Sequence, residues 1–269
     1  RMKTLGIIGG LGPLATAVFL EMVTEKTQGD TDQEHLDVLL RSKPQIPDRT
    51  AYILGRSKES PVPEMIAVGR ELAGLGAQVI AIPCITAHYF HDELEDGVGV
   101  PILHAVRECA EALKKRGVLR AGVLATEGTI ETGLFRRFFD EAGIEAITPD
   151  TENQRKVTHM IYGEVKAGKP LSKETLLEVG RHLRDKGAEV CLLGCTELSV
   201  SRVFYGRVGN ETVKRNENVA GNETVKRNEN VAKNAAVAGN GRGDAPPFLD
   251  VMELLAEAAV KACGAKLRA

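Results

Sequence analysis

Residues 5–15 read LGIIGGLGPLA, and this stretch decides the fold class. A short apolar run is followed by glycines and then by Pro13, which can occupy the first position of a helix because no N–H group is needed there. The pattern predicts a buried strand, a tight turn and a helix. Repetition of this unit is typical of an α/β protein with a mostly parallel sheet.

The same alternation continues along the chain. We expect strands at residues 3–8, 36–41, 78–82, 101–103, 120–125, 144–148, 189–193 and 247–249. Helical patterns lie between them at residues 13–26, 63–75, 105–115, 129–142, 152–167, 173–186 and 251–263. Gly, Pro or Asp residues bound the apolar runs, as turns require.

Two cysteines occupy matching places in this alternation. Cys84 follows the strand that ends near Ile82, and Cys195 follows the strand that ends at Leu193. Each cysteine lies about 75 residues beyond a similar apolar strand, which indicates a structural repeat. We therefore predict two pseudo-symmetric α/β lobes, each with a mostly parallel sheet flanked by helices. The first spans residues 2–115 and is completed by 247–269, and the second spans 116–246.

One segment interrupts the pattern. Residues 209–220 read GNETVKRNENVA, and residues 221–232 repeat them without a change. The stretch 207–241 is rich in Asn, Gly, Lys and Glu and poor in large apolar side chains. Such a composition buries little surface and predicts a flexible insertion. The alternative is a lid that folds over the site.

Composition excludes several classes of protein. A net charge of −2, with 43% hydrophobic and 27% charged residues, describes a globular chain without the basic surface of a nucleic-acid binder. No apolar run reaches the length of a membrane span. Five cysteines in 269 residues indicate free thiols in a reducing compartment, so we expect a cytoplasmic protein.

Two other motifs suggest dinucleotide binding and zinc binding, but the residues around them disfavour both interpretations. Gly10-Leu11-Gly12-Pro13-Leu14-Ala15 fits a dinucleotide-binding turn, but the following strand ends at residues 40–43 without the acidic residue that holds a ribose. The free N–H groups of that turn could instead hold a carboxylate. His88 and His91 lie one helical turn apart, close to Cys84, but no fourth clustered ligand completes a zinc site.

Cys84 and Cys195 differ from the remaining cysteines, which fit core positions in helices and a strand. Each begins a helix, whose free N–H groups favour a thiolate. That effect is worth about 0.3–1 kcal/mol, less than the roughly 1.4 kcal/mol of one pKa unit. Further donors are needed, and Thr86 and Thr196 are the nearest candidates, although both also fit helix caps.

Six motifs together resemble the aspartate/glutamate racemase family, and aspartate racemase most of all. They are IIGGLGP at 7–13, DQEH at 32–35, PQIPDRT at 44–50, PC-x-TAH at 83–88, LAT-x-GT at 124–129 and GCTE at 194–197. The resemblance covers about residues 2–202 and 244–265. It implies a cofactor-independent enzyme, without pyridoxal phosphate or metal, whose active site lies in the cleft between two lobes. It also implies a homodimer and a small amino-acid substrate.

The same resemblance implies roles for particular residues. Cys84 and Cys195 are the catalytic pair: one removes the Cα proton from one face and the other returns a proton on the opposite face. Arg49 holds one substrate carboxylate and Lys166 approaches the other. The remaining substrate contacts are expected at Gly10, Ile85, Thr86, Thr129, Thr196 and Glu197.

Ile85 departs from the family, which usually has Asn between the first cysteine and the threonine. An Ile side chain can neither donate nor accept a hydrogen bond. We expect racemisation of an acidic amino acid, aspartate first and glutamate second. Two alternatives stay open: a related two-cysteine enzyme acting on a hydantoin, maleate or an arylmalonate, and a catalytically silent amino-acid-binding protein.

Overall fold

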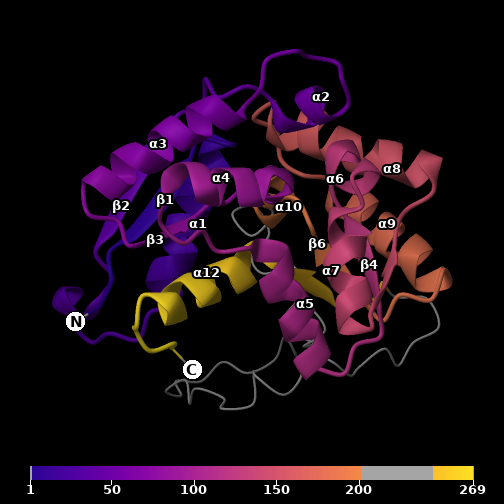
Figure 1. Ribbon diagram of the computed structural model, residues 1–269. Coiled ribbons are helices and arrows are strands. Elements are labelled where there is room, and N and C mark those ends of the chain that lie inside the picture. Colours follow the sequence, from indigo (N-terminus) through magenta and orange to yellow (C-terminus); the bar gives the residue numbers. More distant parts are fainter. Residues whose placement is uncertain (1, 201–244, 269) are drawn as a thin grey trace.

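The computed structural model describes residues 2–200 and 245–268. Seven strands form two parallel sheets (Figure 1). The first sheet has the order β2-β1-β3, with β1 at Leu5–Gly9, β2 at Val38–Ser42 and β3 at Val79–Ala81. The second has the order β5-β4-β6-β7, with β4 at Arg120–Leu124, β5 at Glu145–Ile147, β6 at Val190–Leu193 and β7 at Phe248–Asp250. The predicted α/β class with parallel sheets and two lobes is confirmed.

Helices flank both sheets. Those of the first half are α1 (Pro13–Lys26), α2 (Arg49–Ile53), α3 (Val62–Gly74), α4 (His91–Val98) and α5 (Ala105–Lys115), with short 3-10 turns η1 (Asp32–Glu34) and η2 (Ile85–Phe90). Those of the second half are α6 (Glu127–Glu131), α7 (Leu134–Ala142), α8 (Thr151–Thr158), a π-helical segment at His159–Val165, α9 (Lys173–Asp185), α10 (Thr196–Ser199) and α12 (Val251–Ala262).

Alternate residues of β1 face two different hydrophobic clusters. Ile8 packs with residues of α3 and α4 in the smaller cluster. Leu5 and Ile7 belong to the larger cluster, which also contains α1, α5, α12 and the second sheet. The two lobes therefore share one continuous core, and this core fixes the strand ends of both sheets relative to each other.

The C-terminal segment corrects one predicted boundary. We expected residues 247–269 to complete the first lobe, but β7 pairs with β6 in the second sheet, so the prediction is wrong for this strand. Helix α12 does pack on the first lobe: Lys26 of α1 forms ion pairs with Glu253 and Glu257 at 2.6 and 2.7 Å. The segment thus joins both lobes, because its strand extends the free edge of β6 while its helix covers α1.

Two predicted elements differ in the structure. The helix expected at 129–142 is divided into α6 and α7, because Gly133 adopts a φ of +64°, a left-handed conformation that favours glycine and ends a helix. The strand expected at 101–103 forms only a single bridge, between Ile102 and Ile80. The predicted insertion at 207–241, including the duplicated unit, lies outside the described residues.

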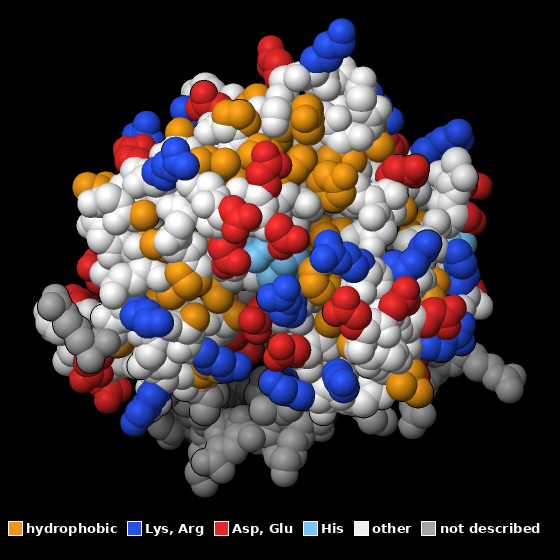
Figure 2. Space-filling view, in the orientation of Figure 1, with side chains coloured by type: hydrophobic (Ala, Val, Ile, Leu, Met, Phe, Trp, Pro, Cys, Tyr) orange, Lys and Arg blue, Asp and Glu red, His pale blue; other side chains and the backbone are white. Residues whose placement is uncertain are grey.

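Acidic and basic side chains are interspersed on the face shown in Figure 2, so neither charge dominates it. This agrees with the net charge of −2. Among residues 2–200 and 245–268, no helix is long and apolar enough to span a bilayer.

Candidate functional site

Cys84 and Cys195 line the same pocket, although they come from different sheets. Cys84 follows β3 and begins η2, and Cys195 follows β6 and begins α10. Both residues have extended backbones at these helix starts, and both side chains are 5% exposed. The carboxyl ends of parallel strands are where α/β proteins bind ligands. The shared core thus brings two buried thiols from matching positions to one place.

The pocket encloses about 260 Å³ of space, part of it open to solvent. Its lining combines the two thiols, charged groups, hydroxyl groups and two aliphatic side chains. The residues are Leu11, Asp48, Arg49, Thr50, Cys84, Ile85, Thr86, Thr126, Tyr162, Lys166, Cys195, Thr196 and Glu197.

Arg49 places a buried cation beside Cys84. It begins α2 and is 7% exposed, and its Nη1 donates to the Pro47 carbonyl oxygen at 3.0 Å. Its Nε has no hydrogen-bond partner. Burial lowers the Arg49 pKa, but interactions with Cys84, Asp48 and Glu197 outweigh burial and leave it raised. Arg49 is therefore a fixed cation with a free donor.

A chain of contacts joins Lys166, Glu197 and Cys195. The Lys166 Nζ lies 2.8 Å from Glu197 Oε1, and the Cys195 thiol donates to Glu197 Oε2 at 2.9 Å. Lys166 also lies over the Tyr162 ring, with Nζ 5.6 Å from the centroid. Burial raises the pKa of Cys195, and the charge and hydrogen bond of Glu197 raise it further. Glu197 Oε2 thus accepts from the Cys195 thiol, whereas Oε1 is paired in charge with Lys166 but accepts no hydrogen bond.

Three threonine hydroxyls form a closed ring at the wall of the pocket. Thr126 Oγ1 donates to Thr129 at 3.1 Å, Thr129 donates to Thr86 at 3.0 Å, and Thr86 lies 2.9 Å from Thr126. Thr86 belongs to η2, whereas Thr126 and Thr129 lie at the start of α6. The ring joins the two lobes next to Cys84. The hydroxyl protons are used within this ring. Thr86 therefore does not donate to the Cys84 thiol, although we had expected it to be a donor.

The structure brings most of the predicted residues together in the pocket, but two of them do not line it. Gly10 does not line the pocket: its N–H donates to Thr16 Oγ1 at 2.9 Å and is not available to a carboxylate, so this expectation is wrong. Glycine is required there because a Cβ would lie 2.5 Å from the backbone nitrogen of Lys43. Thr129 does not line this pocket either; it lies behind Thr86, to which its hydroxyl donates. The other predicted contacts line the pocket, although the Thr196 hydroxyl donates to Glu197 at 3.5 Å rather than to a thiol.

Sequence reasoning did not single out Asp48, Thr50, Thr126 and Tyr162, which also line the pocket. Thr126 and Tyr162 left a signal. Thr126 lies three residues before Thr129, and Tyr162 lies four before Lys166, so helical spacing from the selected residues would have found both.

The two histidines near Cys84 have structural partners. The His88 ring contacts the carbonyl oxygens of Cys84 and Leu103 at 3.0 and 3.2 Å, and His91 Nε2 contacts that of Ile102 at 2.7 Å. Burial, aided by the neighbouring His91, lowers the pKa of His88 to about 4, so its ring is neutral at pH 7. Among the described residues, no group of three or more His, Cys, Asp or Glu side chains is arranged to hold a metal ion.

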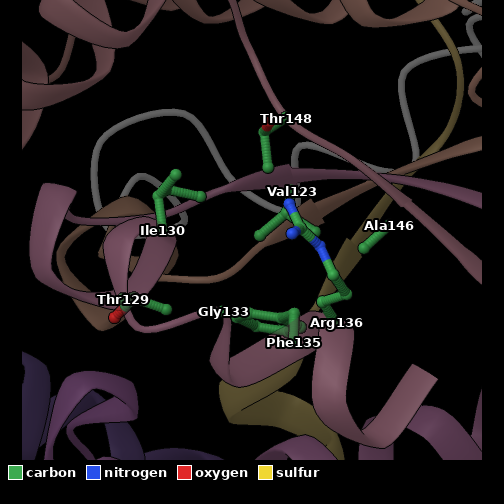
Figure 3. Close-up of a pocket in the computed structure, with 8 residues that line it drawn as sticks. All are labelled: Val123, Thr129, Ile130, Gly133, Phe135, Arg136, Ala146 and Thr148. Atoms are coloured by element: carbon green, nitrogen blue, oxygen red, sulfur yellow. The ribbon is translucent and has the colours of Figure 1, made fainter. Parts of the chain in front are cut away.

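A second pocket lies next to the first. Figure 3 shows it between the end of β4 and the start of α7, with the Arg136 side chain extending toward Val123. It is lined by Thr129, contains neither cysteine and is mostly apolar. The groups able to exchange protons are therefore in the first pocket.

Comparison with known proteins agrees with this arrangement. A sequence model of the Asp/Glu/hydantoin racemase family matches residues 8–205. The chain is 25% identical over 207 residues to the broad-specificity amino-acid racemase RacX of Bacillus subtilis, covering 72% of this chain and 86% of RacX. Its structure is similar to that of Picrophilus torridus aspartate racemase, with a TM-score of 0.71, 26% identity, and coverage of 99% and 96% of the two chains. An aspartate racemase homologue from Pyrococcus horikoshii shares the fold, with a TM-score of 0.67, 21% identity, and coverage of 97% and 99%.

Proposed function

The chain belongs to the Asp/Glu/hydantoin racemase family and is an amino-acid racemase, and we propose that it interconverts the enantiomers of an acidic amino acid, aspartate first and glutamate second. We further propose Cys84 and Cys195 as the two acid/base groups. The observation that carries this proposal is their joint presence, both buried, in one pocket that also holds Arg49 and Lys166.

The two thiols supply what racemisation requires. A thiolate on one side takes the Cα proton, so that the Cα–H bond breaks and an S–H bond forms. The thiol on the opposite side gives its proton to Cα, so that the configuration inverts. The electron pair left on Cα spreads into the substrate α-carboxylate, whose growing charge must be stabilised by fixed donors. Arg49, with its free Nε–H, is the group in the pocket best placed by charge and burial to do so.

The second carboxylate of an acidic substrate would lie toward Lys166. This ammonium group is shared with Glu197, so it offers less net charge than a free lysine would. Ile85 adds an apolar wall at the same pocket. These two features favour a second candidate, a racemase that also accepts less acidic amino acids. RacX, a relative with 25% identity, carries a broad-specificity name.

A panel of single enantiomers in deuterium oxide tests the proposal. Incubation of L- and D-aspartate, glutamate and alanine, followed by mass spectrometry and chiral chromatography, should show inversion together with one solvent deuterium at Cα. A catalytically silent binding protein would bind but not exchange. If no amino acid exchanges but a hydantoin, maleate or an arylmalonate is converted, the protein catalyses a related reaction instead.

Variants at the two cysteines test the mechanism. Cys84→Ala and Cys195→Ala should each keep the fold and lose racemisation, since inversion needs a proton donor and a proton acceptor on opposite faces. Cys109→Ala is the matched control, because it removes a buried thiol from α5 instead of from the pocket. Racemisation at the native rate in either pocket variant would refute the two-thiol mechanism. A homodimer and a cytoplasmic location remain predictions from the sequence, and light scattering can check the first.

A further inference from the structure

The surroundings of the two thiols are opposite in charge. The structural repeat gives Cys84 and Cys195 matching backbone positions, each at a strand end and a helix start. Their partners do not match. Cys84 interacts with the Arg49 guanidinium, whereas the Cys195 thiol donates to the Glu197 carboxylate at 2.9 Å. A symmetric reaction at Cα is therefore served by an asymmetric pair of acid/base groups.

We propose that Glu197 is a positioning residue that holds Cys195 as the protonated thiol in the free enzyme, so that Cys84 is the proton acceptor and Cys195 the proton donor when the first substrate arrives. The inference deepens the proposed function and rests on it. It adds to the role expected for Glu197 as a substrate contact, because Oε2 accepts from the Cys195 thiol while Oε1 accepts no hydrogen bond.

The geometry shows why Glu197 disfavours ionisation of the Cys195 thiol. Ionisation of Cys195 would remove the S–H donor and place a second negative charge 2.9 Å from a carboxylate oxygen, at a residue that is 5% exposed. Like charges at this distance in a buried site disfavour the ionised form. Lys166 forms an ion pair with the other oxygen of this carboxylate.

The other charged or titratable groups facing the pocket do not reverse this effect on the pKa of Cys195. Lys166 lowers the pKa of Cys195, but burial and Glu197 outweigh it and leave the pKa raised well above its usual value. The pKa of Tyr162 is raised to about 12, mainly by burial, so its phenol stays neutral at pH 7. Arg49 is a buried cation that interacts with Cys84. Asp48 forms the cap of α2, with its Oδ1 accepting from the Ala51 N–H.

Alkylation of individual cysteines over a pH series tests the inference without substrate. The native protein is treated with iodoacetamide between pH 6 and about 11, and the modification of each cysteine peptide is measured by mass spectrometry, because only thiolates react. We expect Cys195 to be alkylated only at alkaline pH. In Glu197→Gln the Cys195 midpoint should fall by about one to two pH units, the size of one charged hydrogen bond.

Two further variants sharpen the result. Lys166→Met removes a cation near Cys195 and should move its midpoint upward, opposite to Glu197→Gln. Glu178→Gln removes an exposed carboxylate paired with Lys156 and should leave the midpoint unchanged. The alkaline limb of kcat/KM should follow the Cys195 midpoint downward in Glu197→Gln, which loss of packing alone would not cause.

The outcomes separate this inference from the proposed function. A folded Glu197→Gln protein with an unchanged Cys195 midpoint overturns the role of Glu197. If that variant does not fold, the native protein decides: alkylation of Cys195 at neutral pH overturns the role of Glu197. Absence of Cα exchange by the native protein would refute the racemase mechanism, whatever the alkylation shows.

Discussion

Replacing Ile85 with Asn should strengthen the preference for aspartate while weakening the fold. Ile85 is 2% exposed, belongs to the larger hydrophobic cluster and also lines the pocket. Burial of such a side chain is worth about 1.5–3 kcal/mol, and a buried amide without a partner adds a cost of about 1–3 kcal/mol. We therefore expect the free energy of unfolding to fall by about 2.5–6 kcal/mol in the absence of substrate.

The same amide can donate to a charged carboxylate of the substrate. One such hydrogen bond is worth about 1.5–3 kcal/mol, which corresponds to about 10- to 150-fold in kcat/KM for aspartate relative to alanine. The assay compares both substrates in both directions and is accompanied by urea unfolding. Ile85→Val is the control, because it costs only about 0.5–1.5 kcal/mol and adds no polar group. An unchanged aspartate-to-alanine ratio in folded Ile85→Asn protein would show that this side chain does not reach the substrate.

Three other perturbations have defined outcomes. Thr129→Val breaks the hydroxyl ring between the lobes and should cost about 1–3 kcal/mol in urea unfolding, with Thr132→Val, which lies outside the ring, costing less. The pKa of Asp250 is raised to about 6, mainly by burial, so this residue contributes stability that is fully present below about pH 4 and is lost as the pH rises through 6. Asp250→Asn should remove this pH dependence of the free energy of unfolding. The dependence amounts to at most about 3 kcal/mol, and solvent screening of the half-buried side chain reduces it. Replacing residues 208–240 with a short Gly/Ser connector should leave the melting temperature and rate near native values, as the duplicated polar composition predicts; a large fall in rate alone would indicate a lid.

Sequence reasoning found the fold because its signals are local. The apolar run at 5–9 and the glycines and Pro13 that follow it specify β1 and α1 without reference to the rest of the chain. The matching positions of Cys84 and Cys195 at strand ends follow from the same local patterns. Gly133 carried the signal for a break between α6 and α7, but the surrounding apolar spacing continued through it and masked the turn.

The partners of the site residues depend on contacts between distant segments, and no local pattern specifies these. Lys166 reaches Glu197 from the end of the π-helical segment, and Thr86 meets Thr129 across the two lobes. The residue types suggested substrate contacts in each case. Whether a carboxylate faces a substrate or a neighbouring lysine is decided by packing alone. For the same reason β7 was assigned to the wrong lobe, since a short apolar strand fits the edge of either sheet.

The position of the C-terminal segment has a consequence for biosynthesis. Strand β7 extends the sheet of the second lobe, and α12 covers apolar residues of α1 such as Phe19 and Met22 in the shared core. Of the described segments, this one is translated last, after both lobes have left the ribosome. Until it emerges, the α1 face that it buries is open to solvent and to other nascent chains. We therefore expect the shared core that holds the two strand ends in place to be complete only after this segment has emerged.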